Sequence, residues 1–323
     1  MNFNSARYYL FLPAAAAVYF ALRPKYRNLF LLAASYYFYM CWRPEYAALI
    51  FLSTLSTYVC GLFMDKGLLG RRKLWLAVNL ALNLSVLFFF KYFNFFSGLA
   101  ADAAGLLGFT QARGVSLNVL LPVGISFFTF QALGYTIDVY RKDIPAEKNF
   151  IDYALFVSFF PQLVAGPIER STNLLPQFKR THKFSLDNFH EGFILVLWGL
   201  FKKIVIADRL AVLVNFTYAA APGEVTAAGY IIAAAAFSFQ IYCDFSAYSD
   251  IARGSARILG FTLMKNFDAP YTAFSVRDFW RKWHISLSTW FKDYLYIPLG
   301  GGRKGKLRRC FNVLLVFTDK NKN

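Results

Sequence analysis

The sequence predicts an all-α, polytopic integral membrane protein. Of its 323 residues, 57% are hydrophobic and 16% are charged, whereas soluble globular domains carry about 45–50% apolar and about 25% charged residues. The 37 Phe and 20 Tyr exceed what one soluble core of this size would bury, so lipid must cover part of them. The apolar runs lack the alternation of strands and are too long for them. Helices are therefore expected, because each satisfies its own backbone hydrogen bonds in lipid.

Eight apolar runs define the predicted helices. They cover residues 8–22, 28–42, 46–64, 74–90, 115–137, 153–168, 193–221 and 225–243, and the run 193–221 is interrupted by charges. A helix over either of the first two runs would be about 22 Å long, which is shorter than a hydrocarbon core of about 30 Å. Either these helices extend beyond the runs, or the bilayer is thinned around them.

The distribution of Lys and Arg predicts the topology. Basic residues concentrate in the connections 23–27, 66–73 and 141–148, and the positive-inside rule places these in the cytoplasm and the N-terminus outside. The basic stretch 170–183 would break this rule if 153–168 crossed the membrane. Because 153–168 contains two prolines and a glycine, we expect it to re-enter the membrane from one side.

Neither the charge nor the cysteines indicate another class of protein. The net charge of +17 does not predict nucleic-acid binding, because the basic residues form no continuous face of a folded domain. The four cysteines have neither CxxC nor metal-ligand spacing and are interpreted as small apolar residues. HExxH, P-loop, GxSxG and dinucleotide motifs are missing from the sequence. We therefore expect no metal and no bound cofactor.

The segment 277–294, RDFWRKWHISLSTWFKDY, predicts one amphipathic helix. At about 100° per residue, the aromatic residues occupy one side, and the other side carries Arg277, Arg281, His284 and Ser288. The helix either lies in the membrane interface with its aromatic face down, or packs this face on the bundle. In the second case His284 points into a polar cavity, where a pKa near 6.5 suits it to remove a proton from a hydroxyl.

The segment 242–261 follows the last apolar run. Asp250, Arg253 and Arg257 have the spacing of an ion-paired ladder on one helix face, although an ordinary helix end at the interface has the same pattern. Asp244 directly adjoins the apolar run, and ionisable groups so close to a span are functional candidates. The other two histidines, His182 and His190, are interpreted as solvated.

Four motifs resemble the membrane-bound O-acyltransferase family. They are LPVGISFFTFQALGYTIDVYR (121–141), FPQLVAGPIER (160–170), YCDFSAYSDIARGSARILGF (242–261) and FWRKWHISLSTWFKDYLYIPLGG (279–301). They are most similar to the bacterial branch of alginate O-acetylation and, more distantly, to that of teichoic-acid D-alanylation. The resemblance implies a ring of tilted transmembrane helices with re-entrant segments, forming a single domain over 1–323 in the bacterial inner membrane.

The resemblance also implies the reaction. An acyl group, expected to be acetyl, would pass from a cytoplasmic thioester, acetyl-CoA or a carrier-protein thioester, to a hydroxyl of an exported polysaccharide such as alginate. Further partners would be the lipid bilayer and periplasmic acetylation proteins or a cytoplasmic acyl carrier. His284 matches the WHIS motif and is the expected catalytic residue. The expected substrate-binding residues, which orient substrates or stabilise developing charge, are Arg277, Asp278, Trp280, Arg281, Trp283, Ser286, Ser288, Asp244 and Asp250.

The sequence departs from the family's pattern at its C-terminal end. The family carries a second histidine, generally the catalytic one, in a later GLWHG-like motif on the next hydrophobic helix. Here that helix begins near 310 with CFNVLLVF and turns into TDKNKN, and eight apolar residues do not span a bilayer. We therefore expect a C-terminally truncated chain that is inactive alone. The alternatives are a transporter or flippase of a lipid-linked or acylated substrate, and a non-catalytic scaffold of an acetylation complex.

Overall fold

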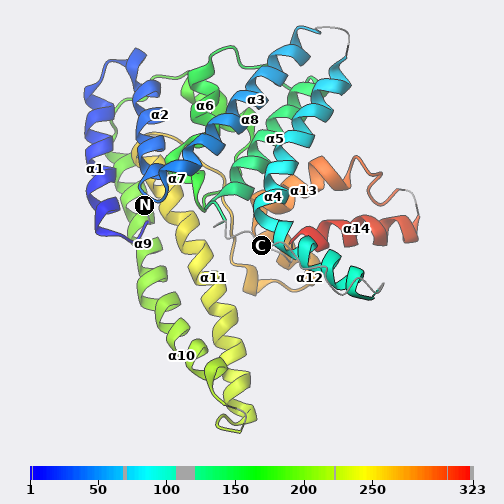
Figure 1. The fold of residues 1–323 in the computed structure, drawn as a ribbon. Helices are drawn as coiled ribbons and strands as arrows, with labels where there is room; N and C mark the ends of the chain where they lie inside the picture. The colour runs from blue at the N-terminus through cyan, green and yellow to red at the C-terminus, as the bar shows by residue number, and fades with distance from the viewer. Residues whose placement is uncertain (2, 68–70, 107–120, 222, 304, 321–323) are drawn as a thin grey trace.

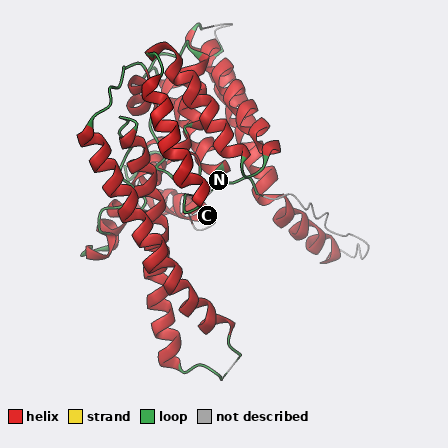
Figure 2. Ribbon diagram, turned by 90° about the vertical axis from the view of Figure 1, so that its left-hand side faces the viewer, coloured by secondary structure: helices red, strands yellow, loops and turns green. Residues whose placement is uncertain are grey.

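The computed structural model describes residues 1–323 except 2, 68–70, 107–120, 222, 304 and 321–323, and the described part contains helices and loops without strands (Figures 1 and 2). The helices are α1 (Ala6–Ala21), α2 (Pro24–Met40), α3 (Ala47–Asp65), α4 (Arg72–Leu106), α5 (Ile125–Arg141), α6 (Phe150–Ser158), α7 (Phe160–Leu163), α8 (Ser171–Phe178), α9 (Leu186–Phe201), α10 (Asp208–Ala219), α11 (Ala227–Ile258), α12 (Val276–Lys282), α13 (Ile285–Phe291) and α14 (Lys306–Lys320). Two π-helical turns, Lys202–Ala207 and Lys292–Tyr296, follow α9 and α13. The predicted all-helical class is confirmed.

Three helical stretches among the described residues are long and apolar enough to cross a membrane. They are Pro44–Asp65, Arg72–Ala104 and Ala227–Ile258, with 22, 33 and 32 residues. Large apolar side chains are exposed on the outside of the bundle, including Phe216 at 75% and Ile231 at 71%. A protein surrounded by water does not display so much apolar surface, which agrees with a membrane protein.

Most of the predicted apolar runs form helices, but the helices begin and end at other residues than the runs. α1 and α2 have 16 and 17 residues, so the first two helices are almost as short as their runs. The run 115–137 lies partly outside the described residues, and α5 begins only at Ile125. The interruption in 193–221 is the π-helical turn between α9 and α10. The last helix begins at Lys306, before the predicted position near 310.

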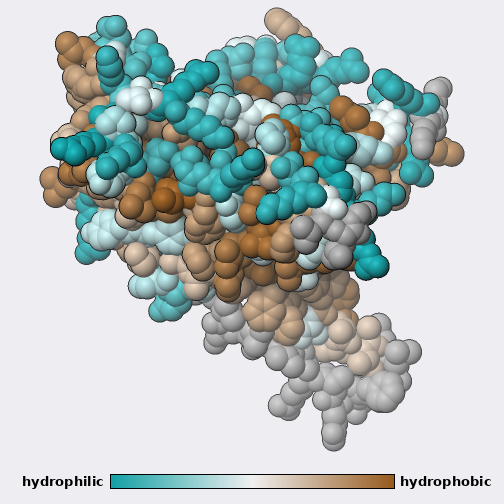
Figure 3. All heavy atoms as spheres, turned by 90° about the horizontal axis from the view of Figure 1, so that it is seen from above, coloured by the Kyte–Doolittle hydropathy of each residue, from teal (hydrophilic) through white to brown (hydrophobic). Residues whose placement is uncertain are grey.

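The basic connections gather at one end of the bundle. The Tyr58 hydroxyl donates to the carbonyl oxygen of Lys148 at 2.6 Å, and Arg72 donates to those of Val139 and Tyr140 at 2.7 and 3.1 Å. Figure 3 looks down on this end, which is uppermost in Figure 1, and hydrophilic residues cover much of it. We call it the basic end, and it corresponds to the end that the charge distribution placed in the cytoplasm.

The predicted re-entrant segment, 153–168, is entered from the basic end, and the chain returns to that end after it. After α6 the chain bends, and α7 has only four residues. Beyond α8 the chain is again at the basic end, because Lys179 forms an ion pair with Glu147 at 2.6 Å and Asn28 donates to the carbonyl oxygen of Phe178 at 2.8 Å. This geometry agrees with the predicted re-entrant segment, and it brings the basic stretch 170–183 to the same end as the other basic connections.

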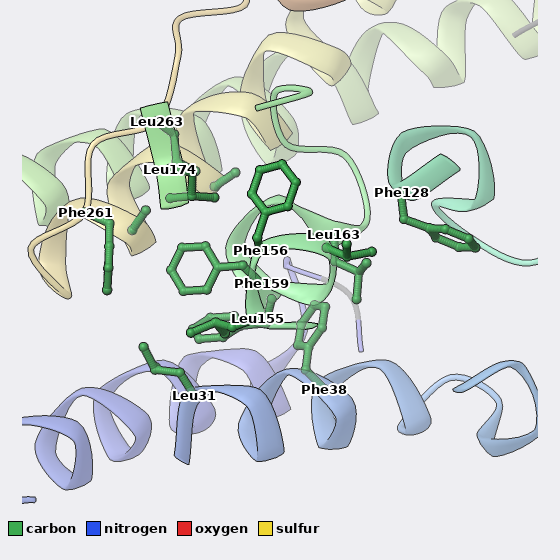
Figure 4. Packing of buried hydrophobic residues seen from close by; sticks show 14 of the residues in the cluster. Leu31, Phe38, Phe128, Leu155, Phe156, Phe159, Leu163, Leu174, Phe261 and Leu263 are labelled. Atoms are coloured by element: carbon green, nitrogen blue, oxygen red, sulfur yellow. The ribbon is translucent and has the colours of Figure 1, made fainter. Parts of the chain in front are cut away.

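Aromatic and aliphatic side chains of the re-entrant segment fill the core. Phe156 and Phe159 have no exposed surface and lie between α2, which contributes Phe38, and the chain after α11 (Figure 4). The ring centroids of Phe159 and Phe261 are 5.1 Å apart in an edge-on contact. Within a membrane, such close packing rather than exclusion of water holds helices together.

Glycines bring α9 and α11 into close contact. A Cβ atom on Gly254 would lie 2.5 Å from the carbonyl oxygen of Gly192, and one on Gly199 would lie 2.8 Å from that of Ala247. Small residues at helix contacts allow such close approach of backbones in membranes. Beyond this contact, α10 and the first half of α11 extend away from the other helices (Figures 1 and 2).

Candidate functional site

His284 lies at a break between two short helices. α12 ends at Lys282, α13 begins at Ile285, and the backbone of His284 is left-handed, with φ 44° and ψ 56°. The predicted continuous helix over 277–294 is therefore wrong. So is the predicted face that Arg281 and His284 would share, because the helical periodicity that placed both residues on one face is interrupted between them.

Hydrogen bonds to the extended chain after α11 replace the missing helical turn. The N–H of Asp268 donates to the carbonyl oxygen of Lys282 at 3.0 Å, and the N–H of Ile285 donates to that of Asn266 at 2.8 Å. The N–H of Ser286 donates to Oδ1 of Asn266 at 3.3 Å. The first N–H groups of any helix need partners outside the helix. Asn266, which is 1% exposed, supplies two of them and so fixes where α13 begins.

Aromatic rings from three parts of the chain surround the imidazole of His284. Phe245 of α11 meets it edge-on, with ring centroids 4.7 Å apart. Phe127 of α5 and Phe267 lie nearly parallel to it at 6.4 and 6.5 Å. The imidazole itself is half-buried. This arrangement defines the orientation of the ring, because each neighbouring ring is positioned by a different element.

The imidazole borders a cavity of about 570 Å³, which we call the histidine cavity. Such a volume is typical of small-molecule sites. The lining comes mainly from the start of α5, from α11 and from α12–α13, and its described residues include no acidic side chain. The prediction that this cavity is polar is thus wrong, because most of its lining residues are apolar or aromatic. The polar side chains in the lining are Lys91, Ser126 and His284.

The histidine cavity lies toward the end of the bundle opposite the basic end. α2 starts at the basic end, and near its other end the Tyr39 hydroxyl donates at 3.0 Å to the carbonyl oxygen of Val123, which lines the cavity. In the opposite direction, α13 and its π-helical turn lead to Tyr294, whose hydroxyl donates to Asp138 of α5 at 2.7 Å. One stretch of chain therefore runs from the cavity toward the basic end.

Two of the predicted substrate-binding residues, Trp280 and Trp283, line the histidine cavity with His284. Two others have structural roles. The hydroxyl of Ser286 accepts the N–H of Ile168 at 3.1 Å, and the hydroxyl of Ser288 donates to the carbonyl oxygen of Trp283 at 3.1 Å. These bonds fasten α13 to the re-entrant segment and to α12.

Three further predicted residues face away from the cavity. The side chain of Arg281 is 74% exposed and pairs with Asp278 at 3.1 Å. A hydrogen bond from Lys282 lowers the pKa of Asp278. Arg277 is exposed. These side chains form a charged outer surface of α12, so the structure does not bring them together with His284.

Asp244 and Asp250 also lie apart from His284, on the face of α11 that meets the π-helical turn after α9. They neutralise two lysines of that turn, which explains why charges occur so deep in the bundle. The predicted ion-paired ladder of Asp250, Arg253 and Arg257 is correct for Arg253, which pairs with Asp250. It is wrong for Arg257, which pairs with Glu191 of α9. The ion pairs are Lys203–Asp244 at 2.6 Å, Lys202–Asp250 at 2.7 Å, Arg253–Asp250 at 3.3 Å and Arg257–Glu191 at 2.8 Å.

The two remaining histidines differ from one another. His190 is exposed on α9, as predicted. The prediction for His182 is wrong, because its ring packs on Phe261 at 4.4 Å between centroids and its Nε2 is hydrogen-bonded to the carbonyl oxygen of Gln177 at 2.9 Å. Neither lines the histidine cavity.

The sequence did not single out Glu169, which follows the re-entrant segment and is 2% exposed. Its carboxyl group accepts the N–H of Met264 and, at 2.7 Å, the side-chain amide of Asn173. Burial raises the pKa of Glu169 to about 7. Because it ties the chain before α8 to the chain after α11, it supports the segment that carries Asn266.

The helices with exposed apolar faces and the histidine cavity are together those of a membrane protein with an enzyme-like site. A model of the membrane-bound O-acyltransferase family matches residues 141–318, a range that includes His284 and most of the cavity's aromatic residues. The chain belongs to this family.

Several relatives match nearly the whole chain. It is 44% identical over 313 residues to the probable alginate O-acetylase AlgI of Pseudomonas putida, covering 95% of this chain and 63% of that protein. It is 36% identical to the peptidoglycan O-acetyltransferase of Helicobacter pylori, covering 96% and 63%, and 25% identical over 182 residues to the teichoic acid D-alanyltransferase of Bacillus subtilis. The chain thus spans about three fifths of the length of the first two relatives.

Proposed function

We propose that this protein is an O-acyltransferase that transfers an acetyl group from a cytoplasmic thioester to a hydroxyl of an exported polysaccharide such as alginate. The observation that carries the proposal is the position of His284, in the WHIS motif, on the wall of the histidine cavity, which Trp283 and Phe245 also line. Relatives named for acyl transfer to alginate, peptidoglycan and teichoic acid support this class of acceptor.

In the proposed reaction, His284 accepts the proton of the acceptor hydroxyl while the hydroxyl oxygen attacks the thioester carbonyl carbon. The tetrahedral intermediate then collapses, the carbon–sulfur bond breaks, and the departing thiolate takes the proton from the imidazolium. The aromatic rings around His284 hold the imidazole in one orientation for both transfers. Trp280 and Trp283 offer flat apolar faces against which a sugar ring or the donor's chain can pack.

The proposed setting is the bacterial inner membrane, crossed several times, with the basic end in the cytoplasm. The donor would be acetyl-CoA or a carrier-protein thioester. The cavity's position toward the other end would place it within reach of an exported polymer and of periplasmic acetylation proteins.

The test is acetyl transfer by the purified 323-residue chain in proteoliposomes, with labelled acetyl donor and alginate. The sequence predicts no transfer by this chain alone, so product from the wild-type chain would show that no further histidine is needed. Any transfer that the chain performs should fall at least about 100-fold in His284→Ala and change little in His190→Ala. Equal transfer by the wild type and His284→Ala would contradict the role of His284. Movement of a lipid-linked or acylated substrate without ester formation would instead support a transporter, and capture of periplasmic acetylation proteins without transfer would support a scaffold.

A further inference from the structure

A second, much smaller space adjoins the imidazole of His284. We call it the niche. Its volume is about 10 Å³, and it is lined by Ser126, Phe127, Phe130, Ile168, His284 and Leu287. Four of these, Ser126, Phe127, His284 and Leu287, also line the histidine cavity. The niche is therefore a side chamber of the cavity, directly beside the reacting imidazole of the proposed function.

The size of the niche selects what enters it. A space of about 10–15 Å³ holds about one water molecule. A methyl group is of similar size, whereas an ethyl or propyl group needs room for further carbons. We propose that the niche receives the methyl group of an acetyl donor and restricts the protein to two-carbon acyl groups. This inference rests on the proposed function, because it assigns a place to the acyl group that His284 would transfer.

The walls of the niche are held rigidly. Phe130 is 8% exposed, its ring lies 4.7 Å from that of Trp290, and its carbonyl oxygen accepts the indole N–H of Trp290 at 2.8 Å. Ile168 is 2% exposed, and its N–H is hydrogen-bonded to Ser286. Close-packed interiors yield little to an added methylene. A longer acyl chain would therefore have to displace walls that other contacts fix.

Ile168 is the residue that we expect to set the limit. It comes from the re-entrant segment, faces α5 and α13 across the niche, and its backbone is anchored independently of its side chain. Shortening this side chain opens the niche without removing a polar group. Discrimination by one methylene in an apolar pocket amounts to about 10–200-fold, so the effect is measurable.

The experiment measures binding of S-acetyl-, S-propionyl- and S-butyryl-pantetheine to the purified chain by titration calorimetry in detergent. Pantetheine is the common end of coenzyme A and carrier-protein donors, so one probe serves both. For the wild type we expect the acetyl thioester to bind at least about 10-fold more tightly than the propionyl thioester. In Ile168→Ala this ratio should fall to about 1, because the opened niche accepts the longer chain.

Two further variants keep the result interpretable. Leu174→Ala shortens a fully buried side chain outside the niche and should leave the ratio unchanged. Ser126→Val narrows the niche and should weaken binding of the acetyl thioester about 10-fold. A folded Ile168→Ala with the wild-type ratio, or a wild type that binds all three thioesters equally, would overturn the inference. Binding of none of the thioesters would contradict the proposed function itself and the niche with it.

Discussion

The left-handed backbone of His284 predicts an unusual response to substitution. A non-glycine residue in this conformation is less stable than in a right-handed one by about 1–2 kcal/mol, and glycine is free of this strain. Glycine also loses about 0.5–1 kcal/mol more conformational entropy on folding than alanine. The difference leaves His284→Gly more stable than His284→Ala by roughly 0.5–1 kcal/mol, although both variants lack the imidazole.

His190 offers a matched control because it is an exposed histidine inside the regular helix α9. At that position glycine should be less stable than alanine by about 1 kcal/mol. The assay is the free energy of unfolding of the four variants in detergent, followed by circular dichroism during denaturant titration. The predicted signs are opposite at the two positions. If His284→Gly were less stable than His284→Ala, by the same margin as at His190, residues 282–286 would be a continuous helix and the described break would be wrong.

Three other predictions concern stability, measured in the same way. Burial raises the pKa of Glu169 from 4.5 to about 7, so between these pH values the folded state holds a proton that the unfolded state releases. The free energy of unfolding should therefore fall as the pH rises from about 4.5 to 7. Glu169→Gln should flatten this pH dependence. Lys202→Met should cost about 1–3 kcal/mol, because Asp250 loses its partner at 2.7 Å but keeps Arg253 at 3.3 Å. Gly254→Ala should be destabilising by several kcal/mol because its Cβ meets the backbone of α9, whereas Gly98→Ala, with no atom within 4 Å, should be neutral or slightly stabilising.

The helical class, the position of most helices and the re-entrant segment were predictable from the sequence. Hydropathy and the placement of Lys and Arg are set by the bilayer, which acts on every segment in the same way. The return of the chain to the basic end near Lys179 was predictable from the Lys and Arg residues of 170–183 alone.

The break at His284 was not predictable from local pattern. The periodicity of 277–294 is helical throughout. The break is set by hydrogen bonds that Asn266 accepts and Asp268 donates, and both residues lie outside that segment. The same limit explains the error at Arg257, whose partner Glu191 is 66 residues away. Trp280 and Trp283 were found because they flank the histidine in sequence. Phe245 and Glu169 were missed because only the folded chain brings them to the site or its support.

The central claim, that the donor's acyl group meets His284 in the histidine cavity, has a direct test in the imidazole signals. The chain has three histidines, so nitrogen NMR of protein labelled at histidine gives three assignable side chains. The account predicts that S-acetyl-pantetheine shifts the signals of His284 and leaves those of His182 and His190 in place. Saturating binding that leaves His284 unchanged, or that shifts either of the other two instead, would contradict it.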